Sequence, residues 1–268
     1  MMADDIRIVI AAHKEYRMPS DPMYIPLHVG AALSDKELGY IKDNTGDNIS
    51  ERNPSFCELT GLYWAWKNQD ADYTGLVHYR RHLSMKKKGR DPFDNVLKYE
   101  EIRPLLYHCS VFLPKKRNYY IETLYSHYAH THYADQLDLT RDIILDLYPE
   151  YKDSFDRVMK RTGGYMFNMM ILRRDLLNDY CTWLFEILFE LEKRYHKDDL
   201  DPFQSRFYGR VSEIIFNVWL DRQLETGRIR PDQIRELSFI YMEPVNWLRK
   251  GTSFLKAKFF HSRYDRSF

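Results

Sequence analysis

The sequence predicts an α/β fold in which helices flank a mostly parallel, open sheet. Residues 6–12, IRIVIAA, form a continuous β-branched run typical of a strand that is buried on both faces. Residues 57–69, CELTGLYWAWKNQ, carry apolar side chains at helical spacing and lead into a second apolar run at 74–77. Strand and helix patterns keep alternating toward the C-terminus. Alternation of this kind is typical of an open sheet whose faces are covered by helices.

The other expected elements follow in chain order. Residues 23–30 form a second extended segment, which Pro26 places at an edge of the sheet. Residues 43–56 are rich in turn-forming and capping residues and predict a loop over a site. Further along, the patterns predict a strand at 109–116, helices within 119–160 that break near Pro149, a strand at 165–172, a helix to residue 195 with Asp175 near its start, a helix at 210–225 and a strand at 237–242.

Composition limits the class of protein. The 268 residues, of which 44% are hydrophobic, predict one domain over residues 1–245. Residues 246–268 mix Lys and Arg with Trp, Phe and Tyr, which suits contact with an anionic membrane or a lipid-linked substrate. A final helix that lays charged side chains along a hydrophobic core is the structural alternative. The net charge of +1 gives no general electrostatic case for binding nucleic acid.

The cysteines and the N-terminus indicate a cytoplasmic protein. Cys57, Cys109 and Cys181 are odd in number and widely spaced, which fits neither a disulfide framework nor a CxxC metal site. The N-terminus carries acidic residues where a secretory signal has basic ones. No segment reaches the roughly 18 uninterrupted apolar residues of a transmembrane helix.

A cationic cluster, HYRR, follows the apolar run at 74–77. Ligands of open α/β sheets bind at the carboxyl ends of strands, and the planar fork of Arg suits phosphate oxygens. His78, Arg80 and Arg81 therefore predict an anionic ligand such as a diphosphate, with ion pairs to nearby helices as the structural alternative. Alternation along an extended chain would place His78 and Arg80 on one side, and Tyr79 and Arg81 on the other.

Two further positions lie at the ends of the predicted 6–12 and 74–77 strands. His13 follows the first strand, where Ala11 and Ala12 would form a floor for a flat base or would simply allow close helix packing. Asp70 and Asp72 resemble a metal-binding carboxylate pair, but they precede their strand and are interpreted as turn residues.

Glu213 lies near the start of the 210–225 helix among apolar residues. Such a carboxylate could have a raised pKa and act as a general base toward a hydroxyl group. Ion pairing with Arg206 or Arg210, or interaction with the helix dipole, is the alternative.

Several common motifs are absent from the sequence. The histidines of HYAHTH, residues 127–132, lack the spacing of a zinc site, and there is no GxGxxG, phosphate loop or GxSxG elbow. No metal site is therefore predicted.

Five blocks, in order, resemble a bacterial family described as a domain of unknown function. They are IRIVIAAHKEYRMPSDPMYIPLHVGA, DNTGDNISERNPSFCELTGLYWAWKN, YTGLVHYRRHL, GGYMFNMMILRRDLLNDYCTWLF and RVSEIIFNVWL, and they run from residue 6 to about residue 220. The family is found among capsular, exopolysaccharide and O-antigen biosynthesis proteins and is taken to consist of glycosyltransferases of the GT-A fold.

The resemblance implies transfer of a hexose, with galactose as the first guess, from a UDP-sugar to a lipid-linked or oligosaccharide acceptor. In GT-A enzymes the corresponding strand ends in a metal-binding carboxylate pair, whereas here it ends in the HYRR cluster. Fixed positive charge would then offset the charge of the leaving diphosphate, so no cofactor is required, with Mn²⁺ and Mg²⁺ left open. The implied contacts are His78, Arg80 and Arg81 to the diphosphate, Ala11, His13 and Asp43 to the nucleotide, Asn168 and Gly164 to the sugar, and Glu213 to the acceptor hydroxyl.

Two other classes of function fit the same residues. One is a non-catalytic module that binds sugar nucleotides or glycans in a polysaccharide assembly complex. The other is a phosphate-ester hydrolase that uses the histidines. Turnover of a UDP-sugar in the presence of an acceptor separates the transferase from both.

Overall fold

The structure is a computed structural model that describes residues 5–85, 89–196 and 200–243. These residues form two compact units. The first, here the sheet unit, comprises residues 5–115, 167–181 and 229–243, and the second, the helical unit, comprises residues 116–166 and 182–228. The predicted domain boundary at residue 245 and the segment 246–268 lie outside the described residues.

The sheet unit contains an eight-stranded sheet with the strand order β3-β2-β1-β4-β5-β10-β6-β9 and a further pairing of β4 with β9. Four strand pairs are parallel and four are antiparallel, so the prediction of a mostly parallel sheet was wrong. The chain reverses direction after β4, and β9, which comes much later in the sequence, runs antiparallel to β4. The strands are β1 (Ile6–Ala12), β2 (Tyr24–His28), β3 (Ile41–Lys42), β4 (Tyr73–His78), β5 (Arg81–Ser84), β6 (Val111–Pro114), β9 (Met170–Arg173) and β10 (Ile234–Tyr241).

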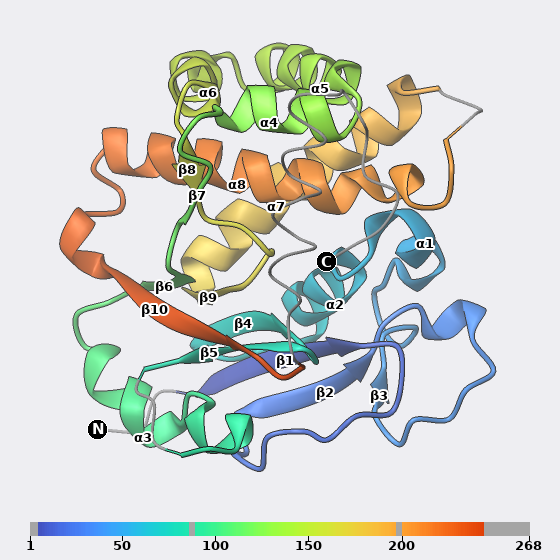
Figure 1. Ribbon diagram of the computed structural model, residues 1–268, viewed down its shortest axis with the longest axis vertical. Coiled ribbons are helices and arrows are strands. Elements are labelled where there is room, and N and C mark those ends of the chain that lie inside the picture. The colour runs from blue at the N-terminus through green and yellow to red at the C-terminus, as the bar shows by residue number, and fades with distance from the viewer. Residues whose placement is uncertain (1–4, 86–88, 197–199, 244–268) are drawn as a thin grey trace. The chain divides into compact units, whose positions relative to one another are not determined.

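A parallel half of this sheet positions the site. β3, β2, β1 and β4 all run in the same direction, so their carboxyl ends share one edge (Figure 1). Strands lie about 4.8 Å apart, so this edge spans about 14 Å from β3 to β4. β1 is central and almost wholly buried, as its β-branched run predicted, and Ala11 lies opposite His78 in the register.

Helix α2 (Leu59–Asn68) covers the parallel strands, and it confirms the helix predicted at 57–69. Gly61 allows the close approach: a Cβ atom there would lie 3.0 Å from a methyl group of Val29. The unit also contains the short helices α1 (Asn53–Phe56) and α3 (Tyr99–Ile102). Helix α7 (Arg174–Arg194) begins in this unit and continues into the helical unit.

The helical unit packs α4, α5, α6 and α8 against one another (Figure 1). Asp221 of α8 accepts a hydrogen bond from Arg157 of α6 at 2.8 Å and another from Arg161. The predicted break near Pro149 is confirmed, because α5 ends at Leu147. The elements are β7 (Arg117–Asn118), α4 (Leu124–Thr131), α5 (Ala134–Leu147), α6 (Lys152–Met159), β8 (Gly163–Gly164) and α8 (Phe207–Glu225), with β7 and β8 paired in a two-stranded sheet.

Across the three described ranges, no helix combines the length and the apolarity needed to cross a bilayer.

Candidate functional site

The HYRR cluster forms a tight hairpin. β4 ends at His78, Tyr79 and Arg80 make the turn, and β5 starts at Arg81, which pairs with His78. The predicted alternation along an extended chain was therefore wrong, because the chain reverses instead of continuing. Cross-strand partners share a face of the sheet, so His78 and Arg81 lie on the same side.

Basic side chains gather around Tyr79 at this hairpin. The ring of His13 lies 5.2 Å from the Tyr79 ring, and the Lys14 ammonium and the Arg80 guanidinium each lie 5.3 Å from it. Glu243 is 3.6 Å from Lys14 and 3.9 Å from Arg80. These ion pairs are long and half-exposed, so they stabilise little and leave the cations able to bind an anion.

A strained turn faces the hairpin. Phe167 and Asn168 have φ angles of 77° and 50°, which bulky residues rarely adopt. His78 Nε2 donates to the carbonyl oxygen of Phe167 at 2.6 Å, and the Arg81 guanidinium lies 4.5 Å from the Phe167 ring. The predicted strand at 165–172 was thus wrong in its first half, since β9 starts at Met170 and Asn168 lies in the preceding turn. Such strain persists where the surroundings fix it, which is common at functional sites.

The protonation of His78 follows from this contact. Burial lowers the pKa of His78, although the nearby Glu58 carboxylate opposes the shift, so the ring is neutral near pH 7. A carbonyl oxygen only accepts, so Nε2 holds the proton and Nδ1 is left with a lone pair. A neutral His78 in this tautomer offers phosphate no further N–H group. The hairpin arginines are therefore the better anion donors, and His78 supports the strained turn.

Glu58 is a residue that the sequence reasoning missed. It is the N-cap of α2, and its carboxylate accepts a hydrogen bond from Asn168 Nδ2 at 2.7 Å. The preceding Cys57 also has a positive φ, 54°. An acidic residue at a helix start is ordinary, because it interacts favourably with the helix dipole. The contact with Asn168, 110 residues later, has no sequence signal.

Asp43 is fully buried at the carboxyl end of β3. Its carboxylate accepts hydrogen bonds from the amides of Gly30 and Ala31 at 2.9 and 3.0 Å. The hydroxyl of Thr60 donates to it at 2.7 Å, and that of Ser50 donates as well. Asp43 therefore ties the end of β2 to α2 and to the loop that follows, and its contact with a nucleotide stays a prediction.

Ala11 and His13 lie at the end of β1. Ala11 is 5% exposed and Ala12 is fully buried. Successive strand residues face opposite sides of the sheet, so the two alanines do not form one floor. His13 is exposed beside Tyr79 and is the more accessible candidate for a ligand contact.

Gly164 and Glu213 belong to the helical unit. A Cβ atom on Gly164 would lie 2.9 Å from the side-chain oxygen of Asn217, so an α8 side chain explains the glycine. Asn217 also accepts a hydrogen bond from the Tyr165 amide at 2.7 Å. Glu213 is half-buried and lies in the second turn of α8, beyond the helix start where it was expected. The sugar and acceptor roles of these two residues stay predictions.

The carboxylates near β4 do not fit a divalent metal at the hairpin. Asp72 lies at the amino end of β4, away from the hairpin, where it accepts a hydrogen bond from the Asp5 amide at 2.8 Å. The carboxyl end of the strand carries Arg80 and Arg81, whose fixed positive charge would repel a cation that prefers oxygen ligands. The HYRR hairpin is therefore suited to an anion.

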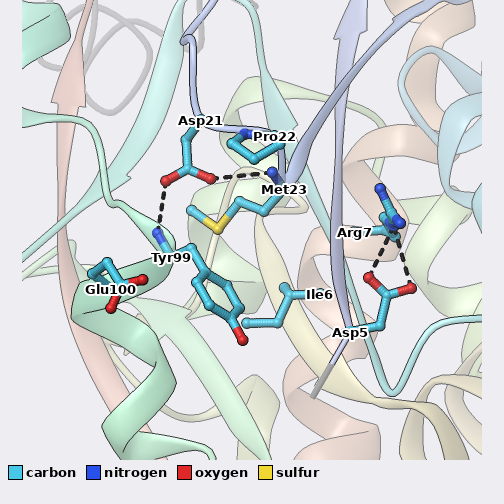
Figure 2. Close-up of a pocket in the computed structure, with 8 residues that line it drawn as sticks. All are labelled: Asp5, Ile6, Arg7, Asp21, Pro22, Met23, Tyr99 and Glu100. Carbon is cyan, nitrogen blue, oxygen red and sulfur yellow. Dashed lines mark hydrogen bonds and ion pairs between the residues drawn. The ribbon is translucent and has the colours of Figure 1, made fainter. Parts of the chain in front are cut away.

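A pocket of about 410 Å³ lies at the opposite end of β1 (Figure 2). Asp21 within it accepts hydrogen bonds from the amides of Met23 and Tyr99 at 3.1 and 2.9 Å. Arg7 and Asp5 pair with each other at 3.0 Å. These polar groups already form hydrogen bonds and an ion pair within the protein. The pocket also lies away from the carboxyl edge that carries the hairpin. We therefore do not assign the ligand to it.

The chain thus places a cationic hairpin and a strained turn at the carboxyl edge of parallel strands, where open α/β sheets commonly bind their ligands. Residues 7–224 match a family described as a domain of unknown function, DUF4422, and the chain belongs to this family. Its structure is similar to the apo structure of the WbbM bifunctional glycosyltransferase, with a TM-score of 0.83 and 31% identity.

That similarity covers 90% of this chain and 46% of the WbbM chain, so the chain spans about half the length of that protein. No functionally curated protein matches this chain. The comparisons support the glycosyltransferase-related family that the sequence blocks implied.

Proposed function

We propose that the protein is a glycosyltransferase that moves a hexose from a UDP-sugar to a lipid-linked or oligosaccharide acceptor of a bacterial surface polysaccharide. Galactose is the first candidate sugar, and the cytoplasmic face of the plasma membrane is the proposed setting. One observation carries the proposal: the cationic HYRR hairpin ends a parallel strand in a chain that is similar over 90% of its length to a glycosyltransferase structure.

Arg80 and Arg81 hold the diphosphate in this proposal. Arg81 lies 4.5 Å from the Phe167 ring and 5.3 Å from the Tyr241 ring, and both rings orient its guanidinium. When the bond between the sugar and the diphosphate breaks, negative charge grows on the leaving oxygen. A fixed guanidinium offsets that charge without reorganising, which lowers the barrier to transfer.

Asn168 contacts the donor sugar, and Glu58 positions it. The hydrogen bond of 2.7 Å from Asn168 to Glu58 fixes the amide, and His78 fixes the backbone one residue earlier. His13 and Ala11 contact the nucleoside from the end of β1. The remaining proposed contacts, which rest on the family resemblance, are Asp43 to the nucleoside, Gly164 to the sugar and Glu213 as the base that accepts the proton of the acceptor hydroxyl.

A thermal-shift screen of nucleotide sugars identifies the donor first, because at equal ligand concentration the folded state is stabilised more by the ligand that binds more tightly. UDP release is then measured with that donor and candidate acceptors. Glu213→Gln should keep the affinity for the donor and lower turnover about 100-fold or more, as expected for a general base. A fully active variant removes Glu213 from the chemistry.

The rival functions give different results in the same assays. Donor binding without turnover for any acceptor would favour a non-catalytic sugar-nucleotide module. Hydrolysis of phosphate esters would favour the hydrolase. Transfer that is unaffected by excess chelator would support the use of fixed cations in place of a metal.

A further inference from the structure

A loop of the helical unit carries exposed apolar side chains that the proposed reaction does not use. This loop, the KRNYYI loop, comprises residues 116–121. Tyr120 is 83% exposed and Ile121 is 60% exposed, although both side chains are large and mainly apolar. Two such residues in succession place a compact apolar tip in water.

The backbone of the loop holds this tip outward. The amide of Ile121 donates to the carbonyl oxygen of Tyr119 at 2.6 Å, which closes a three-residue turn with Tyr120 at its centre. Tyr120 has a φ of 57°, a conformation that is strained for a bulky residue. Strain of this kind persists only where the neighbouring structure fixes it, so the exposure of Tyr120 is imposed by the fold.

Both ends of the loop are anchored. On one side, Arg117 of β7 pairs with Gly164 of β8. On the other, Glu122 is buried, and its carboxylate accepts hydrogen bonds from His127 at 2.8 Å and His130 at 2.7 Å. The apolar tip is therefore presented on a rigid base.

The base of the loop is cationic. Residues 116–121 and 160–165 lie side by side through the pairing of β7 with β8, and together they contain four basic residues and no acidic ones. Arg161 also pairs with Asp221 of α8. The four basic residues are Lys116, Arg117, Lys160 and Arg161.

We infer that the KRNYYI loop docks the protein on an anionic lipid membrane. Tyr and Ile suit the boundary between headgroups and acyl chains, and each Lys or Arg near an anionic surface adds attraction. Asp221 offsets the charge of Arg161 and the histidines pair with Glu122, but no ion pair to an acidic residue is seen for Lys116, Arg117 or Lys160 among the described residues, and this local excess of positive charge fits anionic headgroups. Docking on a membrane would bring the protein to the lipid-linked acceptor of the proposed function. The reason for docking rests on that proposed function, whereas the membrane binding itself does not.

The test is co-sedimentation of the full chain with vesicles in the absence of donor and acceptor. We expect binding to phosphatidylcholine vesicles that contain about one third phosphatidylglycerol, and much weaker binding to pure phosphatidylcholine. Tyr120→Ser with Ile121→Ser should weaken binding to the anionic vesicles about tenfold. Tyr107→Ser with Leu33→Ser is the matched control, because these side chains are 82% and 60% exposed in the sheet unit. This control should bind as the wild type does.

Two results would overturn the inference: a wild-type chain that does not prefer anionic vesicles, as expected if a protein occupies the loop, or equal binding by the wild type and the Tyr120/Ile121 variant. Transfer to a water-soluble acceptor is measured on the same variant. Full transfer with lost docking supports the inference, and failure of docking alone leaves the proposed transfer reaction intact.

Discussion

Two clusters in the molecule join histidine to a carboxylate, and they are built in different ways. In the helical unit, Glu122 accepts hydrogen bonds from His127 and His130, which lie one turn apart on α4. In the sheet unit, Glu58 and His78 fix the turn at 167–168 from two other segments of the chain. The first cluster spans nine residues, whereas the second joins residues up to 110 positions apart.

The difference separates a structural cluster from a candidate site. The Glu122 cluster is local and buried, and both carboxylate oxygens are paired. The Glu58 cluster adjoins three non-glycine residues with positive φ angles, Cys57, Phe167 and Asn168, and a cationic hairpin. Tyr120, two residues before Glu122, is strained as well, so strain alone does not separate the clusters. The distinction is that both oxygens of Glu122 are paired within one helical segment, whereas the Glu58 cluster adjoins cations at the carboxyl end of a parallel strand.

The largest expected effect is on catalysis at the hairpin. Arg81→Ala should lower the rate of transfer at saturating donor about 100-fold, because it removes charge that stabilises the leaving diphosphate. Arg81→Lys keeps the charge but loses the planar fork of the guanidinium. Its rate of transfer should therefore lie between those of Arg81→Ala and the wild type. Steady-state kinetics of all three proteins checks this, and equal rates would remove Arg81 from the site.

The corresponding change in the other cluster should alter stability alone. Glu122→Gln keeps the shape but leaves one histidine N–H group facing an amide donor, so we expect a loss of about 1–3 kcal/mol in the free energy of unfolding. Urea denaturation measures this loss, and calorimetry with UDP should give unchanged affinity. Weaker UDP binding by a folded Glu122→Gln variant would contradict the separation of the two clusters.

The Glu122 cluster should also make stability depend on pH. Burial lowers the pKa of His127 to about 4, despite the opposing effect of the hydrogen bond that His127 donates to Glu122. The unfolded chain, with an ordinary histidine pKa near 6.5, then binds more protons, so this stability is lost as pH falls from about 6.5 toward 4. The slope due to one histidine is about 1.4 kcal/mol per pH unit. Urea denaturation between pH 7 and 5 should therefore show a shallower slope for His127→Gln than for the wild type.

The smallest effect should come from Glu58→Gln. The new amide oxygen can still accept the hydrogen bond from Asn168, so the free energy of unfolding should change by less than about 0.5 kcal/mol. Loss of the carboxylate charge near His78 should lower turnover only several-fold, whereas Glu58→Ala, which also frees Asn168, should lower it further. Equal turnover in both variants and the wild type would show that Glu58 does not position the site.

Local patterns predicted the regular elements well. The β-branched run gave β1 at its observed bounds, and helical spacing predicted α2 and α8 within three residues of their ends. The HYRR hairpin was missed because Tyr79 and Arg80 carry none of the Asn-Gly or Asp-Gly signals of a two-residue turn. The direction of β9 was missed as well, since periodicity does not encode whether neighbouring strands run parallel or antiparallel.

The candidate site was only partly predictable for a related reason. The cations of the hairpin are contiguous in sequence, so their chemistry could be recognised. The turn at 167–168 requires left-handed backbone at two non-glycine residues, which local propensity disfavours. Asp43 accepts hydrogen bonds from amides thirteen and twelve residues earlier in the chain. These bonds depend on how β2 and β3 pair, which is a tertiary property.

Calorimetric titration with UDP tests the central claim, that the carboxyl-edge hairpin binds a nucleotide diphosphate. We predict that Arg80→Ala weakens UDP binding by about 1.5–3 kcal/mol, the range for a hydrogen bond to a charged group. Arg103→Ala is the control: Arg103 is similarly exposed in the same unit and has an ion pair of the same 3.9 Å length. It should bind UDP as the wild type does. Unchanged affinity in Arg80→Ala, or an equal loss in Arg103→Ala, would contradict the account.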